Sequence, residues 1–172
     1  MIRFILCIAF FSIAKANAQI SKVTLQASGL TCSMCSNAIN KSLSKVSYVT
    51  SVKANIKESS FELTFTPNSI VNFDELKNKV EDAGFFVSTM TAEADLSTGK
   101  RMAVNKVQLP GMVIQFLKGM PATLSSKQIF TVVDKGFVSN KIFKQYSKLY
   151  AKEFSTEEPV QQKDVRLYRV MM

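Results

Sequence analysis

The chain has 172 residues, is 47% hydrophobic and has a formal net charge of +9, from 22 basic and 13 acidic side chains. It contains no histidine, which excludes Ser–His and Cys–His nucleophilic catalysis, histidine proton shuttling and mixed Cys–His zinc sites. A chain of this length can bury a substantial core and does not need a disulfide scaffold. Its few cysteines are therefore available for a functional role.

The first eighteen residues are typical of a secretory signal peptide. Arg3 supplies the positive start, an apolar run follows, and Ala16-Asn17-Ala18 is a small-x-small cleavage site before Gln19. The apolar run is too short to span a bilayer, and no later stretch approaches about twenty apolar residues. We therefore expect an exported chain with no membrane span after cleavage; a retained N-terminal anchor is the alternative.

Cleavage would remove Cys7 and leave two cysteines, Cys32 and Cys35. It would also remove Arg3 and Lys15, which lowers the net charge to +7. Most of the remaining basic surplus lies in 93–172. A solvated basic surface is the simplest interpretation, acidic partners and lipid headgroups are alternatives, and nucleic acid is not expected for an exported protein.

Residues 19–91 predict one α+β unit. Four segments alternate apolar and polar side chains as half-buried strands do, at 22–27, 49–56, 61–65 and 85–90. Two segments have helical spacing: 33–45, with Met34, Ala38, Ile39, Leu43 and Val46 on its apolar face, and 73–83, with Asn72 as N-cap and Gly84 as C-cap glycine. The order βαββαβ predicts a ferredoxin-like sandwich, an antiparallel four-stranded sheet with both helices on one face.

The remaining residues predict a second, smaller unit. Residues 92–100 are polar and are expected to be a linker, and 101–172 is expected to be a small β-rich domain with one helix. Strands are predicted at 102–109, 113–117, 129–133 and near 165–170, and Ser139 would cap the helix. An OB-like barrel is one arrangement that fits this pattern.

The sequence Cys32-Ser33-Met34-Cys35 lets both sulfurs point at one small object, a metal ion or each other. Cys32 is expected on the loop after the first strand and Cys35 in the first helical turn, where the positive end of the helix dipole favours thiolates. Two thiolates without histidine form a soft site that prefers Cu(I), Hg(II) or Ag(I), whereas zinc requires four ligands. Thiol–disulfide exchange and a structural disulfide are the alternatives.

The segment Gly29-Leu30-Thr31-Cys32-Ser33-Met34-Cys35 resembles the Gly-Met-Thr-Cys-x-x-Cys loop of the heavy-metal-associated domain family. Asp82-Ala83-Gly84-Phe85 also falls where that family places its closing segment, so the resemblance covers about 21–90. It implies Cu(I) held by two sulfurs and passed on by thiolate exchange. The family includes cytosolic copper chaperones, modules of copper-transporting P-type ATPases and the periplasmic mercury-binding protein.

Carried over residue by residue, the resemblance makes Cys32 and Cys35 the metal ligands. It places Thr31 beside the first ligand and Phe85 at the aromatic or lysine position near the metal loop. Because metal transfer needs an accessible loop, we expect Ser28 and Ser33 to form the rim together with these two residues. Two positions depart from the family pattern. Leu30 replaces a methionine that packs under the loop, and Ser47-Tyr48 stands where many members have a glycine before the second strand.

From these features we predict an exported, periplasmic protein without catalytic activity. It would bind Cu(I) through Cys32 and Cys35, then buffer the ion or pass it to another metal-binding or transport protein. Mercury(II) scavenging and thiol–disulfide redox work by the same cysteines are the alternatives. The methionines of the C-terminal part are expected to pack in the core or lie exposed by chance rather than bind metal.

Overall fold

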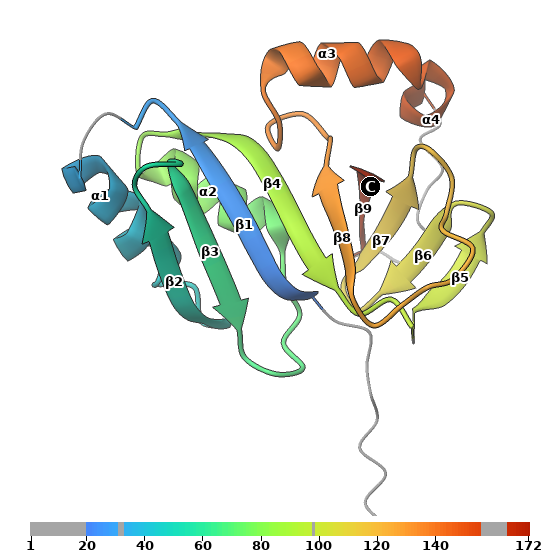
Figure 1. Ribbon diagram of the computed structural model, residues 1–172, viewed down its shortest axis with the longest axis horizontal. Coiled ribbons are helices and arrows are strands. Elements are labelled where there is room, and N and C mark those ends of the chain that lie inside the picture. The colour runs from blue at the N-terminus through green and yellow to red at the C-terminus, as the bar shows by residue number, and fades with distance from the viewer. Residues whose placement is uncertain (1–19, 31–32, 98, 156–164) are drawn as a thin grey trace, which may run out of the picture.

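The computed structural model describes residues 20–30, 33–97, 99–155 and 165–172. All strands in these ranges belong to one sheet, in the order β2-β3-β1-β4-β8-β9-β7-β6-β5 (Figure 1). The strands are β1 (Ile20–Ser28), β2 (Val49–Asn55), β3 (Ser60–Phe65), β4 (Phe86–Ala94), β5 (Lys100–Ala103), β6 (Lys106–Leu109), β7 (Met112–Phe116), β8 (Gln128–Val132) and β9 (Arg166–Met171). The helices are α1 (Ser33–Leu43), α2 (Phe73–Asp82), α3 (Asn140–Leu149) and α4 (Ala151–Ser155).

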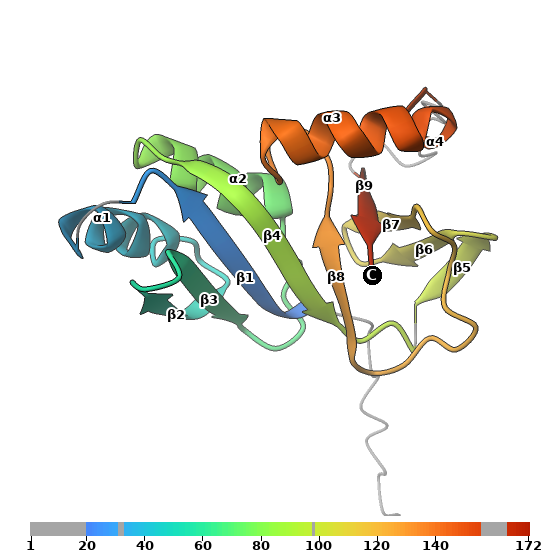
Figure 2. The same ribbon diagram turned by 45° about the horizontal axis from the view of Figure 1, so that its top comes forward.

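The N-terminal half is the predicted ferredoxin-like unit. Its strands pair antiparallel in the order β2-β3-β1-β4, and α1 and α2 lie together behind that sheet (Figures 1 and 2). The alternation of β1 follows the expected period of two, with Val23 and Leu25 fully buried toward the helices and Thr24 between them on the other face. The α+β fold predicted for this half is confirmed.

Both ends of α2 form as its sequence predicts. The Asn72 side chain accepts a hydrogen bond from the Glu75 amide at 3.2 Å, which satisfies one amide that the first turn leaves without a helical partner. At the other end Gly84 adopts φ +86°, and the amides of Gly84 and Phe85 donate to the carbonyls of Glu81 and Val80. This left-handed end turns the chain into β4.

The apolar face of α1 differs from the prediction. Ile39, Leu43 and the following Val46 are buried, but Met34 is 81% exposed and Ala38 is also exposed. Met34 precedes Ile39 by five residues, which places it about 140° away around the helix axis. Ser36, three residues before Ile39, takes the buried position instead.

Tyr48 replaces the glycine of the family pattern without loss of the turn before β2. Its hydroxyl donates to the Glu75 carboxylate at 2.9 Å and accepts from the Asn72 amide at 3.2 Å. Burial, together with the neighbouring Glu75, raises the pKa of Tyr48, so the phenol remains a hydrogen-bond donor at neutral pH. The side chain therefore ties this turn to the start of α2.

The predicted linker 92–100 begins inside a strand. β4 continues to Ala94, and Ala92, Ala94 and Leu96 are all fully buried. Along Met90–Ala94, β4 pairs antiparallel with β1 on one side and with β8 on the other. β4 therefore joins the two halves of the molecule in one sheet.

The C-terminal half extends this sheet rather than closing into an OB-like barrel. β5, β6 and β7 form an antiparallel meander, β9 lies parallel to β7 and antiparallel to β8, and the sheet ends at β5. The predicted strand 102–109 is two strands, because the chain turns at 104–105. Ser139 caps α3 as expected, its hydroxyl accepting from the Ile142 amide at 3.4 Å, and α4 is an additional short helix.

One apolar core runs through both halves. It contains Phe73, Leu76 and Val80 of α2 together with Phe130, Phe137 and Tyr168. The Tyr168 ring lies 5.0 Å from that of Phe73, and its hydroxyl donates to the Asp74 carboxylate at 2.9 Å. Contacts between residues almost a hundred positions apart thus attach β9 to α2.

A second apolar cluster lies under α3 and α4. Leu117, Val133 and Val138 are buried beneath the aromatic face of the two helices, which carries Phe143, Tyr146, Tyr150 and Phe154.

In the part of the chain that the structure describes, no helix is long and apolar enough to cross a bilayer.

Candidate metal centre

The predicted metal loop lies between the end of β1 and the start of α1. Gly29 follows β1 with φ +83°, a conformation that favours glycine. Leu30 is half-buried and packs against the core, in agreement with the packing role predicted for it. Thr31 and Cys32 lie outside the described residues.

Cys35 lies in the first turn of α1 and is half-buried. Ser33 begins the same helix and is exposed. No acidic side chain occupies the first turn of α1, so the positive end of the helix dipole is not offset there by a carboxylate of the same turn. This environment favours the thiolate form of a cysteine.

The start of β4 lies beside the same end of the molecule. Ser28 is the register partner of Phe86, and its hydroxyl donates to the Phe86 carbonyl at 3.3 Å. Phe85, the predicted rim residue, is half-buried and packs against the core. The structure thus brings Ser28 close to the segment that carries Phe85.

Two exposed apolar side chains near this loop were not among the predicted site residues. Phe86 is 68% exposed and Met34 is 81% exposed. A strand places consecutive side chains on opposite faces, so the pair Phe85-Phe86 already implied that one ring packs inward and the other faces solvent. The exposure of Met34 could not be predicted, because the sequence does not show that Ser36 takes the buried position in this part of α1.

The donor atoms available near α1 suit a soft ion. A Cys-x-x-Cys pair offers two thiolate sulfurs, the ligand type that Cu(I) and related ions prefer. Within the described residues, no group of three or more histidine, cysteine, aspartate or glutamate side chains could hold a metal. Of the C-terminal methionines, Met112 is buried, whereas Met102 and Met172 are about half exposed, at 49% and 56%.

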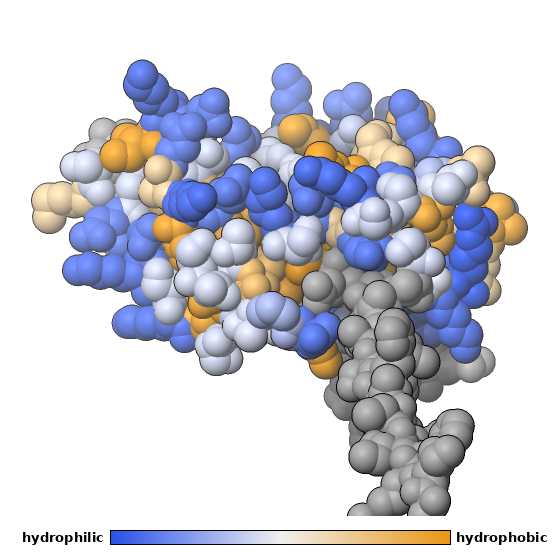
Figure 3. All heavy atoms as spheres, turned by 60° about the horizontal axis from the view of Figure 1, so that its bottom comes forward, coloured by the Kyte–Doolittle hydropathy of each residue, from blue (hydrophilic) through white to orange (hydrophobic). Residues whose placement is uncertain are grey.

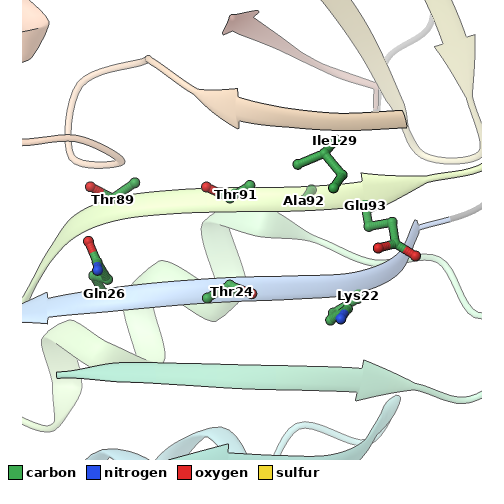
Figure 4. A pocket seen from close by; sticks show the side chains of 8 residues that line it. All are labelled: Lys22, Thr24, Gln26, Thr89, Thr91, Ala92, Glu93 and Ile129. Atoms are coloured by element: carbon green, nitrogen blue, oxygen red, sulfur yellow. The ribbon is translucent and has the colours of Figure 1, made fainter. Parts of the chain in front are cut away.

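A shallow hollow of about 330 Å³ lies on the opposite face of the sheet from α1 and α2. Figure 4 shows Thr24 of β1 and Thr89 and Thr91 of β4 along it, with Lys22 and Glu93 at one end. Both charged groups have partners, Lys22 with Glu62 at 3.2 Å and Glu93 with Lys127 at 3.4 Å. Since its charged groups are already paired, we assign no ligand to this hollow. Figure 3, in which the lower edge of Figure 1 comes forward, likewise shows polar and apolar side chains interspersed.

A comparison with protein families decides what this unit is. The family model of the heavy-metal-associated domain matches residues 24–86. Residues 24–86 are a heavy-metal-associated domain. The match includes Cys32 and Cys35 and ends at the start of β4, so the whole C-terminal half lies outside it.

Relatives of this heavy-metal-associated domain include a copper-transporting ATPase, RAN1 of Arabidopsis thaliana, which is 29% identical over 77 residues. The aligned part is 45% of this chain but only 8% of that ATPase. Among solved structures, the CopZ metallochaperone is 27% identical over 39% of this chain and 98% of its own, with a TM-score of 0.36. Oxidized MerP from Ralstonia metallidurans CH34 is 30% identical over 41% and 96%, with a TM-score of 0.37.

Proposed function

We propose that this protein binds one soft metal ion, Cu(I) in the first place, through the sulfurs of Cys32 and Cys35. The observation that carries the proposal is the family match over residues 24–86, which spans both cysteines. The position of Cys35 in the first turn of α1 supports it, because the helix end favours a thiolate and a thiolate is the form that binds metal.

The protein would act as a carrier or buffer without catalysing a reaction. An ion held by two sulfurs keeps room for an incoming third ligand, so it can move to a partner by ligand exchange. Exposed Ser33 at the start of α1 is consistent with an accessible loop. The partner would be another metal-binding or transport protein.

We further propose that the protein works outside the cytoplasm, in the periplasm. The support is the composition of residues 1–18, with a basic start, an apolar run and a small-x-small cleavage site. Fractionation of the source cells, with mass spectrometry of the N-terminus, tests this. Recovery of the protein with residues 1–18 intact in the cytoplasm would contradict it.

An anaerobic titration with Cu(I), in competition with the chromophoric chelator bicinchoninate, tests the metal site. We expect one equivalent to bind tightly, and binding to fall at least a hundredfold in Cys32→Ser and in Cys35→Ser. The titration uses the uncleaved chain, in which Cys7→Ser is the matched control, because it removes a thiol outside the heavy-metal-associated domain and should leave affinity unchanged.

The same titration separates the alternatives. Tight Hg(II) binding with weak Cu(I) binding would indicate scavenging of mercury. If the reduced protein retains neither ion, while Cys32 and Cys35 cycle with a reduction potential close to that of the compartment, thiol–disulfide exchange replaces metal binding as the function.

A further inference from the structure

The helix α3 carries a basic face that the metal site does not explain. Lys141, Lys144 and Lys148 recur at intervals of three and four residues, which places them within about 60° of one another around the helix axis. All three are exposed, and α3 contains no acidic residue. Within the described ranges, none of the ion pairs involves any of these three lysines.

The opposite face of α3 packs on the protein itself. Ile142, Phe143, Tyr146 and Tyr150 pack on the cluster of Leu117, Val133 and Val138. The helix is therefore held with its lysines directed outward. In Figures 1 and 2, α3 lies along an outer boundary of the molecule, apart from the metal-loop end of α1.

We propose that the Lys141–Lys144–Lys148 face of α3 is a docking surface for an anionic phospholipid bilayer. The three charges extend over roughly 10 Å along a nearly straight line, a shape that fits a flat sheet of headgroups. They are lysines, which act as mobile point charges, and not arginines, whose planar fork suits a specific carboxylate. A diffuse layer of phosphate groups is the partner that matches them.

Leu149 supports a lipid partner over an acidic protein. It lies at the end of α3 beside Lys148 and is 67% exposed, an unusual position for a large aliphatic side chain on a helix that has an apolar cluster to pack against. An apolar side chain flanking a basic helical face can enter the boundary between headgroups and acyl chains. A partner protein recognised by charge alone would not need it.

Vesicle flotation of the full chain tests the proposal. Vesicles of phosphatidylcholine alone are compared with vesicles in which a third of the lipid is phosphatidylglycerol. The readout is the ratio of binding to the two vesicle types, so attraction through the apolar side chains of residues 1–18 cancels. The charges of Arg3 and Lys15 are the same in every variant, so comparison between variants removes their contribution. We expect a strong preference for anionic vesicles that disappears near 1 M salt, where the screening length is only about 3 Å.

The decisive variant is the triple substitution Lys141→Gln, Lys144→Gln and Lys148→Gln. Each lysine near an anionic surface contributes about a fivefold factor, so the preference should fall roughly a hundredfold. The matched control replaces Lys41, Lys45 and Lys53, which are exposed on the other half of the molecule, and changes the net charge equally. This control should lose no more than a few-fold.

Three results would overturn the proposal. The first is equal binding of the wild-type protein to both vesicle types. The second is an equal loss in the two triple variants, which would show a general charge effect. The third is binding to soluble polyglutamate but not to anionic vesicles, which would assign the face to an acidic protein. Far-UV circular dichroism confirms that each variant is folded.

Discussion

The helices of the two halves are attached to the sheet in different ways. α1 and α2 each bury several side chains completely, including Ile39 and Leu43 of the first and Phe73, Leu76 and Val80 of the second. α3 has an amphipathic sequence but no buried residue, because its aromatic side chains remain partly accessible above a small cluster. The heavy-metal-associated domain thus has a deep core, whereas the C-terminal half ends in a surface layer.

This difference indicates where each half can tolerate change. Removal of a side chain beneath α2 leaves a cavity in a core that both halves share, whereas removal of a lysine from α3 touches nothing underneath. We therefore expect a site that needs precisely held side chains to lie beside the deep core. A site that needs only surface charge is expected on α3. The following four tests examine this contrast, beginning with the largest effect.

Phe73→Ala should lower the free energy of unfolding by about 3–5 kcal/mol, because Phe73 is fully buried and packs against Tyr168. Since the core is continuous, urea unfolding followed by circular dichroism and by tyrosine fluorescence should show one transition moved to lower denaturant. Leu43→Ala, on α1, is the control and should move the same transition. Two separate transitions, only one of them sensitive to Phe73→Ala, would show that the halves fold independently.

Arg169→Gln should cost roughly 3 kcal/mol at neutral pH, because it leaves the buried carboxylate of Asp134 without its cation. The guanidinium donates to Asp134 at 3.0 Å, and both side chains are mostly buried. Arg169 also lies over the Phe154 ring of α4, so the surface layer should loosen as well. Urea unfolding at several pH values measures the effect.

The pH dependence of this variant has a definite sign. Burial raises the pKa of Asp134 above its ordinary value even with Arg169 beside it, so the folded state binds the proton more readily than the unfolded state does. Stability from this group therefore decreases as pH rises from the ordinary carboxyl pKa to the raised one. Loss of Arg169 enlarges that decrease, and the deficit should shrink in acid. A deficit that does not change with pH would contradict this account, and Asp134→Asn with Arg169→Gln should remove the dependence.

Gly29→Ala should cost about 1–2 kcal/mol of stability and weaken metal binding. The position has φ +83°, and an added Cβ would meet nothing within 4 Å, so the cost comes from the backbone alone. Gly119 has φ +95° and equally open space, but it lies in the C-terminal half. Gly119→Ala should therefore show the same thermal destabilisation with unchanged Cu(I) affinity. An equal loss of Cu(I) affinity in both variants would show that metal binding does not depend specifically on the geometry of the β1–α1 loop.

Leu30→Met should have the smallest effect, with Cu(I) affinity nearly unchanged and stability within about 1 kcal/mol. Leu30 packs against the core, and methionine fills a similar volume. Competitive Cu(I) titration and thermal unfolding measure the two quantities. A loss of affinity greater than tenfold would mean that this side chain does more than support the loop.

The sequence predicts the N-terminal half well because its signals are local. Alternation in β1 and β3, the Asn72 cap and Gly84 each involve residues a few positions apart. The orientation of α1 was the exception. The apolar side chain of Met34 was predicted to face the core, but Ser36 is buried and Met34 is exposed. The positions of Leu30 and Cys35 are as the sequence predicts, whereas the role of Cys32 and Cys35 as metal ligands stays a prediction.

The C-terminal half depends on contacts that no local pattern shows. Residues 91–94 have the sequence Thr-Ala-Glu-Ala, which is only a weak strand signal. They nevertheless belong to β4, because they pair with β1 and β8. The parallel pairing of β7 with β9 and the contact of Tyr168 with Asp74 join residues more than fifty positions apart. The residue pattern of one strand or side chain does not predict which distant residue it will contact. A separate domain was therefore predicted where the sheet in fact continues.

The order of strands also has a consequence for how copies of this protein behave when crowded. β4 would be an edge strand of the heavy-metal-associated domain, but it pairs with β8. In the described residues β2 and β5 are therefore the outermost strands of the sheet. β2 carries Lys53, and β5 begins with Lys100 and Arg101 and is exposed throughout. Like charges at both margins oppose the addition of another molecule's strand. The sheet formed by the described residues is therefore not expected to extend by edge-to-edge pairing, and a concentrated solution should resist growth into fibrils.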